Sequence, residues 1–253
     1  MVIVEENKGY AATLGTCSAD PYYCSLASAY ASYTSWQAVT HPSLPNYLAL
    51  DSGSTQGCAS DRCATGLNAA DLGGQLNAAG IPWTAYMESM PSACYSGGAS
   101  GDYARKHNPF LYFTDTASSC SIHDVPYPGS SSMLSALDGS SAPSFVWITP
   151  NLQNDMHHGT VQQGDAWLQA NLAGVLTSSW FTNFHSTVIV TMDEGPSANA
   201  IPMVVISSTS KGKGAIATIG NHYGTLRAIE EAFGLGYLGA ASNPANGDPF
   251  ISF

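Results

Sequence analysis

The sequence predicts an α/β fold in which helices cover both faces of a mostly parallel central sheet. Short apolar runs of strand length recur along the chain, segments with helical spacing lie between them, and several strand runs are apolar at every position. Continuously apolar strands that alternate with helices are typical of parallel sheets, because both faces of such a sheet are buried. We find no boundary within the 253 residues and expect a single domain over residues 1–253.

The elements can be placed in order. We predict strands at residues 2–4, 35–39, 81–87, 144–149, 187–192 and 202–207. Helical spacing covers residues 22–31, 71–79, 161–176 and 223–233. Pro45 is well placed as the first residue of a further helix that runs to Leu50. Residues 89–143 are rich in Ser, Gly and Pro, so we expect a disulfide-stapled excursion there.

Composition limits the choice of partner. The chain has 18 acidic and 7 basic residues, a formal net charge of −11, and no long basic stripe. Nucleic acid and anionic membrane surfaces are therefore not expected as partners. Charged residues make up only 10% of the chain. A surface covered mostly by small polar residues favours a secreted, extracellular protein over a cytosolic one.

The six cysteines support the same location. They fall as Cys17/Cys24, Cys58/Cys63 and Cys94/Cys120, and nearest-neighbour pairing is the simplest connectivity. We expect three disulfides formed in an oxidising compartment, with six buried thiols as the alternative. No apolar run is long enough to span a membrane, so stable membrane insertion is not expected. We also expect that Met1 stands where a leader has been removed.

The segment THPSLPNY at residues 40–47 contains a candidate nucleophile. Two prolines hold the chain extended there, so Ser43 lies where a strand gives way to a helix. Unpaired N–H groups at a helix start favour an anion beside the Ser43 hydroxyl. The alternative is an ordinary serine in a proline-rich turn.

Potentially reactive residues follow four of the predicted strands. Because the carboxyl ends of parallel strands lie along one edge of a sheet, we expect these side chains to meet. They are Glu6 and Asn7, Ser43, Asp155 with His157 and His158, and Asp193 with Glu194. Clustered carboxylates repel one another unless a cation is bound among them. We therefore predict a divalent metal held by Glu6, Asp193 and Glu194.

A metal beside a serine suits phosphoryl transfer, because the cation lowers the pKa of the hydroxyl and polarises a phosphoryl oxygen. Asn46 is expected to donate to a second phosphoryl oxygen. Asp155 and His157 are expected on the leaving-group side, where a histidine can supply a proton. Lys106 and His107 belong to a cationic stretch that can position phosphate. The structural alternatives are an acidic turn at 193–195, a capping turn at 155–157 and a surface loop at 105–107.

Two further histidines are candidates for substrate binding. His41 is part of the Ser43 segment. His222 opens the predicted helix at 223–233, where it is either a site residue or a buried core histidine.

Six motifs distributed along the chain resemble the phosphoesterase family of the alkaline phosphatase superfamily. They are EENKGY at 5–10, HPSLPNY at 41–47, KHNPFLYF at 106–113, NDMHHGT at 154–160, MDEG at 192–195 and NHYGTLRAIEEAFGL at 221–235. The family includes secreted acid phosphatases and non-specific phospholipases C. The resemblance implies an alkaline-phosphatase-like three-layer α/β/α sandwich.

The resemblance also implies roles for single residues. Glu6, Asn7, Asp193 and Glu194 would coordinate the metal, and Ser43 would be the phosphorylated nucleophile. Relatives tend to have an acid where this chain has His158, which leaves the role of His158 open.

We therefore expect a metal-dependent phosphoric ester hydrolase of acid phosphatase type that acts on a small phosphate ester through a phosphoserine at Ser43. One or two divalent ions are expected, with Ca²⁺, Mg²⁺, Mn²⁺, Zn²⁺ and Fe all open. One alternative is a phospholipase C that cleaves phospholipid diesters. Another is a secreted binding module that has lost catalysis.

Overall fold

A computed structural model describes residues 1–196, 199–210 and 213–249. Within these residues the strands form one sheet in the order β4-β3-β5-β1-β6-β7-β2-β8. The fold class predicted from the sequence is confirmed. The strands are β1 (Val2–Glu5), β2 (Ala31–Gln37), β3 (Trp83–Met87), β4 (Asp124–Pro126), β5 (Phe145–Thr149), β6 (Thr187–Met192), β7 (Met203–Ser207) and β8 (Gly214–Asn221).

The sheet is mostly parallel, with β1 between β5 and β6 at its centre. All four residues of β1 are buried, which is why its sequence is apolar up to the final glutamate. Strand β7 is the exception, since it runs antiparallel to both β6 and β2. The chain from Met192 to Met203 is too short for a helical crossover, so β7 has to return beside β6 in the opposite direction.

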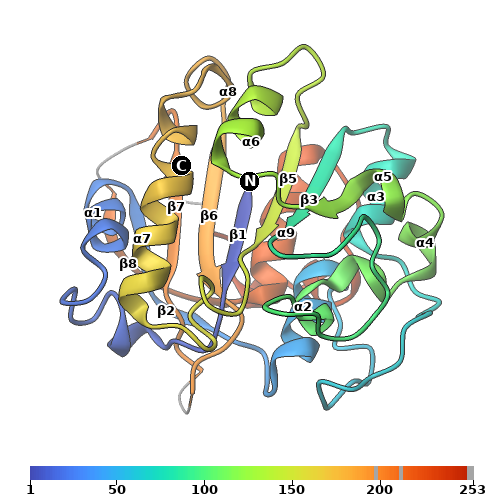
Figure 1. Cartoon of the computed structure of the whole chain (residues 1–253). Helices are drawn as coiled ribbons and strands as arrows, with labels where there is room; N and C mark the ends of the chain where they lie inside the picture. The colour runs from blue at the N-terminus through green and yellow to red at the C-terminus, as the bar shows by residue number, and fades with distance from the viewer. Residues whose placement is uncertain (197–198, 211–212, 250–253) are drawn as a thin grey trace.

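Helices cover both faces of the sheet (Figure 1). On one face α1 (Pro21–Ala29) and α6 (Ser130–Leu137) pack against α7 (Val161–Leu172). On the other face α2 (Ser43–Ser52) packs against α3 (Leu72–Ala78) and α9 (His222–Phe233). The remaining helices are short: α4 (Thr114–Ala117), α5 (Cys120–His123) and α8 (Ser179–Thr182), with 3₁₀ turns at Tyr10–Ala12, Arg105–His107, Pro109–Leu111, Val175–Thr177, Gly239–Ser242 and Pro244–Asn246.

Helix α2 differs from the sequence prediction in where it begins. Its first residue is Ser43, with Pro42 at the N-cap, whereas Pro45 was expected to be first. Pro45 is tolerated in the first turn because the N–H groups there have no partner within the helix. Every residue of α2 is buried. Packing on all sides therefore holds the candidate nucleophile in place.

Other boundaries also shift. The predicted helix at 22–31 ends at Ala29, and Ala31 already belongs to β2. Strand β8 was not predicted, because this edge strand is half exposed and rich in Gly and Ala. The excursion at 89–143 is more ordered than its composition suggested, since it contains β4, α4, α5 and α6.

The expected cysteine pairing is confirmed: the disulfides are Cys17–Cys24, Cys58–Cys63 and Cys94–Cys120. The last of these lies within the excursion and ties the loop at Cys94 to the start of α5. Among the described residues, no helix combines the length and apolarity that crossing a bilayer requires.

Candidate active site

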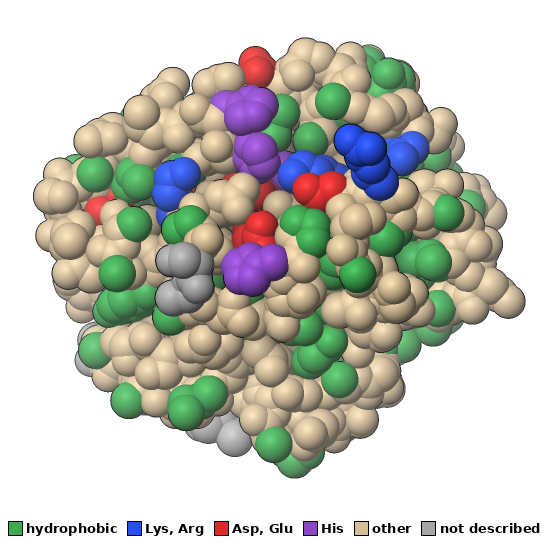
Figure 2. All heavy atoms as spheres, turned by 90° about the horizontal axis from the view of Figure 1, so that it is seen from below, with side chains coloured by type: hydrophobic (Ala, Val, Ile, Leu, Met, Phe, Trp, Pro, Cys, Tyr) green, Lys and Arg blue, Asp and Glu red, His purple; other side chains and the backbone are tan. Residues whose placement is uncertain are grey.

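The chemistry-bearing residues converge at the carboxyl ends of the central strands. Glu6 and Asn7 follow β1, Asp193 and Glu194 follow β6, and the loop with Asp155 follows β5. The Glu6 N–H donates to the Asp155 carbonyl oxygen at 2.7 Å, and the Asp193 N–H donates to the Glu5 carbonyl oxygen at 2.9 Å. These bonds hold the three strand ends together. Viewed from this end, acids, histidines and lysine or arginine side chains gather at the middle of the face (Figure 2).

Ser43 lies within hydrogen-bonding reach of this cluster. Its Oγ donates to Glu6 Oε2 at 3.2 Å and lies 3.5 Å from Glu194 Oε1. The Asn7 N–H donates to Asp193 Oδ1 at 3.1 Å, and the Asn7 side-chain amide donates to Glu6 Oε2 at 3.0 Å. Helix α2 therefore brings Ser43 against the acids that follow β1 and β6, as the strand-end argument predicted.

His107 is placed differently from what its position in a cationic stretch suggested. The side chain is buried, and its ring stacks on Tyr47 with centroids 5.3 Å apart. Its Nε2 lies 3.0 Å from Glu6 Oε1, and its Nδ1 lies 3.3 Å from Asp155 Oδ2. His107 thus lies inside the acid cluster, because the 3₁₀ turn at Arg105–His107 directs it inward.

The close atoms around His107 are not aligned as hydrogen bonds. Within the described part of the chain, the buried side-chain atoms without a hydrogen-bond partner include Glu6 Oε1, His107 Nε2, Asp155 Oδ2, His157 Nδ1 and Asp193 Oδ2. Buried polar atoms are rarely left unpaired, and neighbouring nitrogen and oxygen lone pairs that face one another suit a bound cation. Ligand atoms of Glu6, His107 and His157 lie within 4.8 Å of one another, as a shared metal requires.

The pKa values in the cluster fit the same interpretation. Burial, followed by the charges of Asp193 and Asp155, raises the pKa of Glu6 well above its usual range. Burial, followed by Glu194, raises the pKa of Asp193 to about 7. Burial also lowers the pKa of His107 well below its usual range, so the ring is neutral. A neutral imidazole is the form that binds metal, and a cation can replace the protons that the acids otherwise hold.

Lys106 lies at the outer wall of the cluster. Its Nζ is 2.8 Å from Asp61 Oδ2 and 3.4 Å from His157 Nε2. Asp61 Oδ1 in turn accepts the Leu44 N–H at 3.1 Å, one residue after the candidate nucleophile. Asp61 was missed in the sequence analysis. The sequence does contain a hint of its role, since Asp61 lies between Cys58 and Cys63. Their disulfide fixes the loop of Asp61 beside α2.

Asn46, which we predict to donate to a phosphoryl oxygen, hydrogen-bonds to backbone groups of its own loop. Its Oδ1 accepts the N–H groups of Val39 and Thr40, and its Nδ2 donates to the carbonyl oxygens of Thr40 and Pro42. The amide is fully engaged with the backbone that precedes Ser43. In this structure Asn46 therefore shapes the loop that precedes Ser43, the candidate nucleophile.

The other predicted histidines lie around the acids. His41 is 2.5 Å from Glu194 Oε2 through its Nδ1. His222 is buried, and its Nε2 lies 2.5 Å from the Asp193 carbonyl oxygen. Burial lowers the pKa of His222 to about 4. His222 is thus buried and holds the Asp193 turn through Nε2, while its Nδ1 has no partner among the described residues, and its role in the site stays a prediction. His158 packs edge-on against His157, with ring centroids 4.7 Å apart.

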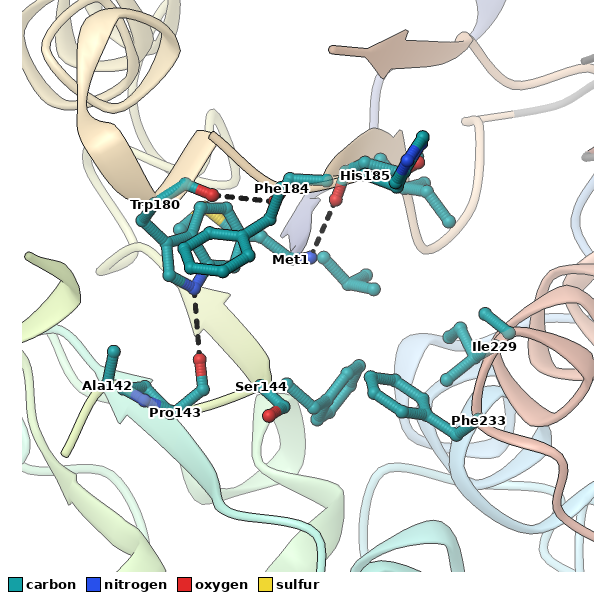
Figure 3. A pocket seen from close by; sticks show the side chains of 15 residues that line it. Met1, Ala142, Pro143, Ser144, Trp180, Phe184, His185, Ile229 and Phe233 are labelled. Atoms are coloured by element: carbon teal, nitrogen blue, oxygen red, sulfur yellow. Dashed lines mark hydrogen bonds between the residues drawn. The ribbon is translucent and has the colours of Figure 1, made fainter. Parts of the chain in front are cut away.

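A cavity of about 350 Å³ lies at the opposite edge of the sheet, where β1, β5 and β6 begin (Figure 3). Trp180, Phe184 and Phe233 point into it, and His185 is its only titratable side chain. It has no converging acids or nucleophile. The candidate active site is therefore the cluster at the carboxyl edge.

Solved structures with low sequence identity share this fold. A protein of the alkaline phosphatase superfamily from Vibrio parahaemolyticus superposes with a TM-score of 0.68 at 13% identity, over 96% of this chain and 69% of that one. The phosphonate monoester hydrolase of Agrobacterium radiobacter gives a TM-score of 0.65 at 10% identity, over 100% of this chain and 78% of that one.

Sequence relatives are phosphatases. Over 246 residues the chain is 35% identical to the phosphatidylinositol-3-phosphatase of Mycobacterium tuberculosis, covering 96% of this chain and 79% of that protein. It is 28% identical to a probable acid phosphatase of Kluyveromyces lactis, over 97% of this chain and 60% of that protein. It is 30% identical to the acid phosphatase of Aspergillus fumigatus, over 87% and 52% respectively. The chain thus spans little more than half the length of these two fungal relatives.

The fold, the site and these relatives define a phosphoric ester hydrolase. The Phosphoesterase family model matches residues 16–236. The chain belongs to the Phosphoesterase family, as its motifs predicted.

Proposed function

We propose that this protein is a metal-dependent phosphomonoesterase that forms a phosphoserine at Ser43. The observation that carries the proposal is the position of the Ser43 hydroxyl, 3.2 Å from Glu6 Oε2 and 3.5 Å from Glu194 Oε1, at the first residue of a fully buried helix. A hydroxyl beside carboxylates has a proton acceptor, and a cation bound among those carboxylates would make the helix start a favourable place for a phosphoryl group.

In the proposed reaction the Ser43 oxygen bonds to phosphorus while the bond from phosphorus to the leaving oxygen breaks. Glu6 Oε2 accepts the hydroxyl hydrogen bond, and the departing alcohol needs a proton from the other side. Lys106 and His157 border the cavity on that side, and we propose that the Lys106 ammonium group, 3.4 Å from His157 Nε2, supplies this proton with His157 as its acceptor and relay. Water then hydrolyses the phosphoserine, which restores Ser43 and releases phosphate.

The unpartnered buried atoms fit a divalent cation. We propose Glu6, Asn7, Asp193 and Glu194 as its ligands near Ser43, with His107 and His157 as candidates for a second position that shares Glu6. When bound, such a cation supplies charge neutralisation and lowers the pKa of a neighbouring hydroxyl. The mixture of oxygen and imidazole donors is compatible with several metals.

A monoester substrate is our preference over the phospholipid diester of a phospholipase C. The cavity beside the site has a volume of about 250 Å³, which suits a headgroup or small alcohol better than the acyl chains of a lipid. The relatives named above are phosphatases, one of them for a phosphoinositide. We also propose that the protein works outside the cytoplasm, since it carries three disulfides.

The experiment is a trapping assay with a soluble aryl phosphate. Acid quenching of the metal-loaded enzyme during turnover, followed by peptide mass spectrometry, should show one phosphoryl group on the peptide that contains Ser43. Trapping on another residue would overturn the nucleophile assignment. Cleavage of phosphatidylcholine without any monoesterase activity would favour the phospholipase. Absence of both activities after metal loading would favour a binding module.

A further inference from the structure

The cavity of about 250 Å³ shares a wall with the candidate active site. Lys106 and His157 belong to that wall, and Arg105, Tyr112 and Leu152 also line the cavity. The residues at 98–104 that border it come from the excursion tied by Cys94–Cys120. His157 and Lys106 lie on the leaving-group side of the proposed reaction, so this cavity offers the leaving group a place.

The charges lining this cavity do not balance. The Lys106 ammonium group is paired with Asp61. Arg105 also lines the cavity, and no carboxylate in residues 1–196, 199–210 or 213–249 forms an ion pair with it. Asp61 lines the cavity as well, and the remaining titratable side chains of the lining are Tyr112, His157 and His158. One uncompensated cationic charge thus faces the cavity in a chain whose net charge is −11.

Arg105 is held in place by Ser96 and by a hydrogen bond to the Tyr112 side chain, which leaves further N–H groups of its guanidinium for a ligand. Its Nη1 donates to the Ser96 carbonyl oxygen at 2.8 Å, and the guanidinium lies 5.8 Å from the centre of the buried Tyr112 ring. A guanidinium fixed by its neighbours loses little freedom when it binds an anion. Its planar fork matches two oxygens of a phosphate group.

We propose that the cavity binds the leaving group and that Arg105 selects leaving groups which carry a second phosphate, such as a phosphorylated cyclitol or sugar. This inference rests on the proposed function, because it assumes that the ester is cleaved at Ser43. The second phosphate can belong to a soluble molecule or be the diester phosphate of an inositol lipid headgroup. Arg105 recognises the same group in both, and the apolar Leu152 and Tyr112 side chains offer a surface for the ring between the two phosphates.

The test compares two soluble esters with the same scissile bond. Inositol 3-phosphate has no second phosphate, whereas glycerophosphoinositol 3-phosphate carries a diester phosphate that a monoesterase leaves intact. We expect the wild-type enzyme to favour the second ester. Arg105→Gln should lose about 10-fold more kcat/KM on the second ester than on the first, mainly through KM, which corresponds to about 1.4 kcal/mol of binding. Arg105→Lys, which keeps the charge but not the fork, should recover part of the loss.

The matched control is Lys213→Gln, which removes one positive charge just before β8, at the opposite edge of the sheet. It should leave the ratio of the two esters unchanged. An equal loss on both esters in Arg105→Gln would show that Arg105 only supports the loop, and an unchanged ratio would show that it contacts no second phosphate. Either result overturns the proposal.

A third substrate, phosphatidylinositol 3-phosphate in phosphatidylcholine vesicles, separates the two sources of the phosphate. If Arg105→Gln loses activity on the soluble ester that carries the second phosphate, either alone or together with the vesicle substrate, the result supports recognition of the leaving group. A defect confined to vesicles would mean that Arg105 contacts the membrane surface, which contradicts the proposal. If wild-type enzyme cleaves none of these esters and no aryl phosphate, the proposed function itself fails. If it cleaves them all without preference, only the present inference fails.

Discussion

His107 Nε2 and Glu6 Oε1 lie 3.0 Å apart in the buried interior, yet neither atom has a hydrogen-bond partner among the described residues. An imidazole and a carboxylate at that distance normally align as donor and acceptor, because leaving either group unpaired costs about 1–3 kcal/mol. Their arrangement fits two ligands that face a common ion.

The first prediction concerns this pair. His107→Gln should weaken metal binding by about 10-fold or more, because the variant loses an imidazole donor. Metal content after dialysis against a weak chelator is the measurement. His185→Gln, an exposed histidine at the opposite edge of the sheet, is the control. Full metal retention by the His107 variant would remove His107 from the ligand set.

The second prediction concerns the nucleophile. Ser43→Ala should lower kcat on an aryl phosphate by at least about a thousandfold, while the thermal unfolding temperature stays near that of the wild type. Ser52→Ala lies at the far end of the same helix, where its hydroxyl donates to the Leu48 carbonyl oxygen, and should retain turnover. Appreciable turnover by the Ser43 variant would point to direct attack by water.

The third prediction concerns Asp61. Burial alone would lower the pKa of Lys106, but its hydrogen bond and ion pair with Asp61 raise it. Asp61→Asn removes the ion pair and should raise KM about 10-fold, because Lys106 is no longer held beside the site. Steady-state kinetics would measure the change, with the exposed Asp115→Asn as control. A fall in kcat at constant KM would instead assign Asp61 to the chemical step.

The fourth prediction concerns how the free energy of unfolding depends on pH. Burial raises the pKa of Asp124 to about 7 and that of Asp71 to about 6, whereas an unfolded Asp titrates near pH 4 by rough average. Between these values the folded chain retains protons that the unfolded chain has lost. The contribution of these two carboxyls to the free energy of unfolding should therefore fall as the pH rises from about 4 to about 7. Thermal unfolding temperatures measured across that range would show the slope.

Asp124→Asn tests the cause of that slope. The carboxyl of Asp124 accepts from the side-chain amide of Asn108, whose own Oδ1 has no partner among the described residues, so an asparagine can pair there without titrating. The variant should show a flatter dependence of unfolding temperature on pH. An unchanged slope would assign the effect to other buried carboxyls.

Much of the site followed from the order of strands in the sequence. The continuously apolar runs at 144–149 and 187–192 predict central parallel strands, and this places Glu6, Asp155 and Asp193 at one edge. The pattern could not show the inward direction of His107 or the contact between Asp61 and Lys106. Both depend on irregular loops, where no periodicity relates sequence position to side-chain direction. Strand β8 escaped prediction for a similar reason, since only its penultimate residue is buried.

The two oxygens of Glu6 face different groups: Oε2 accepts from Ser43, and Oε1 lies against His107. One carboxylate thus links both halves of the site, so a disturbance on the histidine side is transmitted to the serine. In a double-mutant cycle, changes at Ser43 and His107 should consequently be non-additive. A substitution on the histidine side of the site should therefore also change the properties of the serine side.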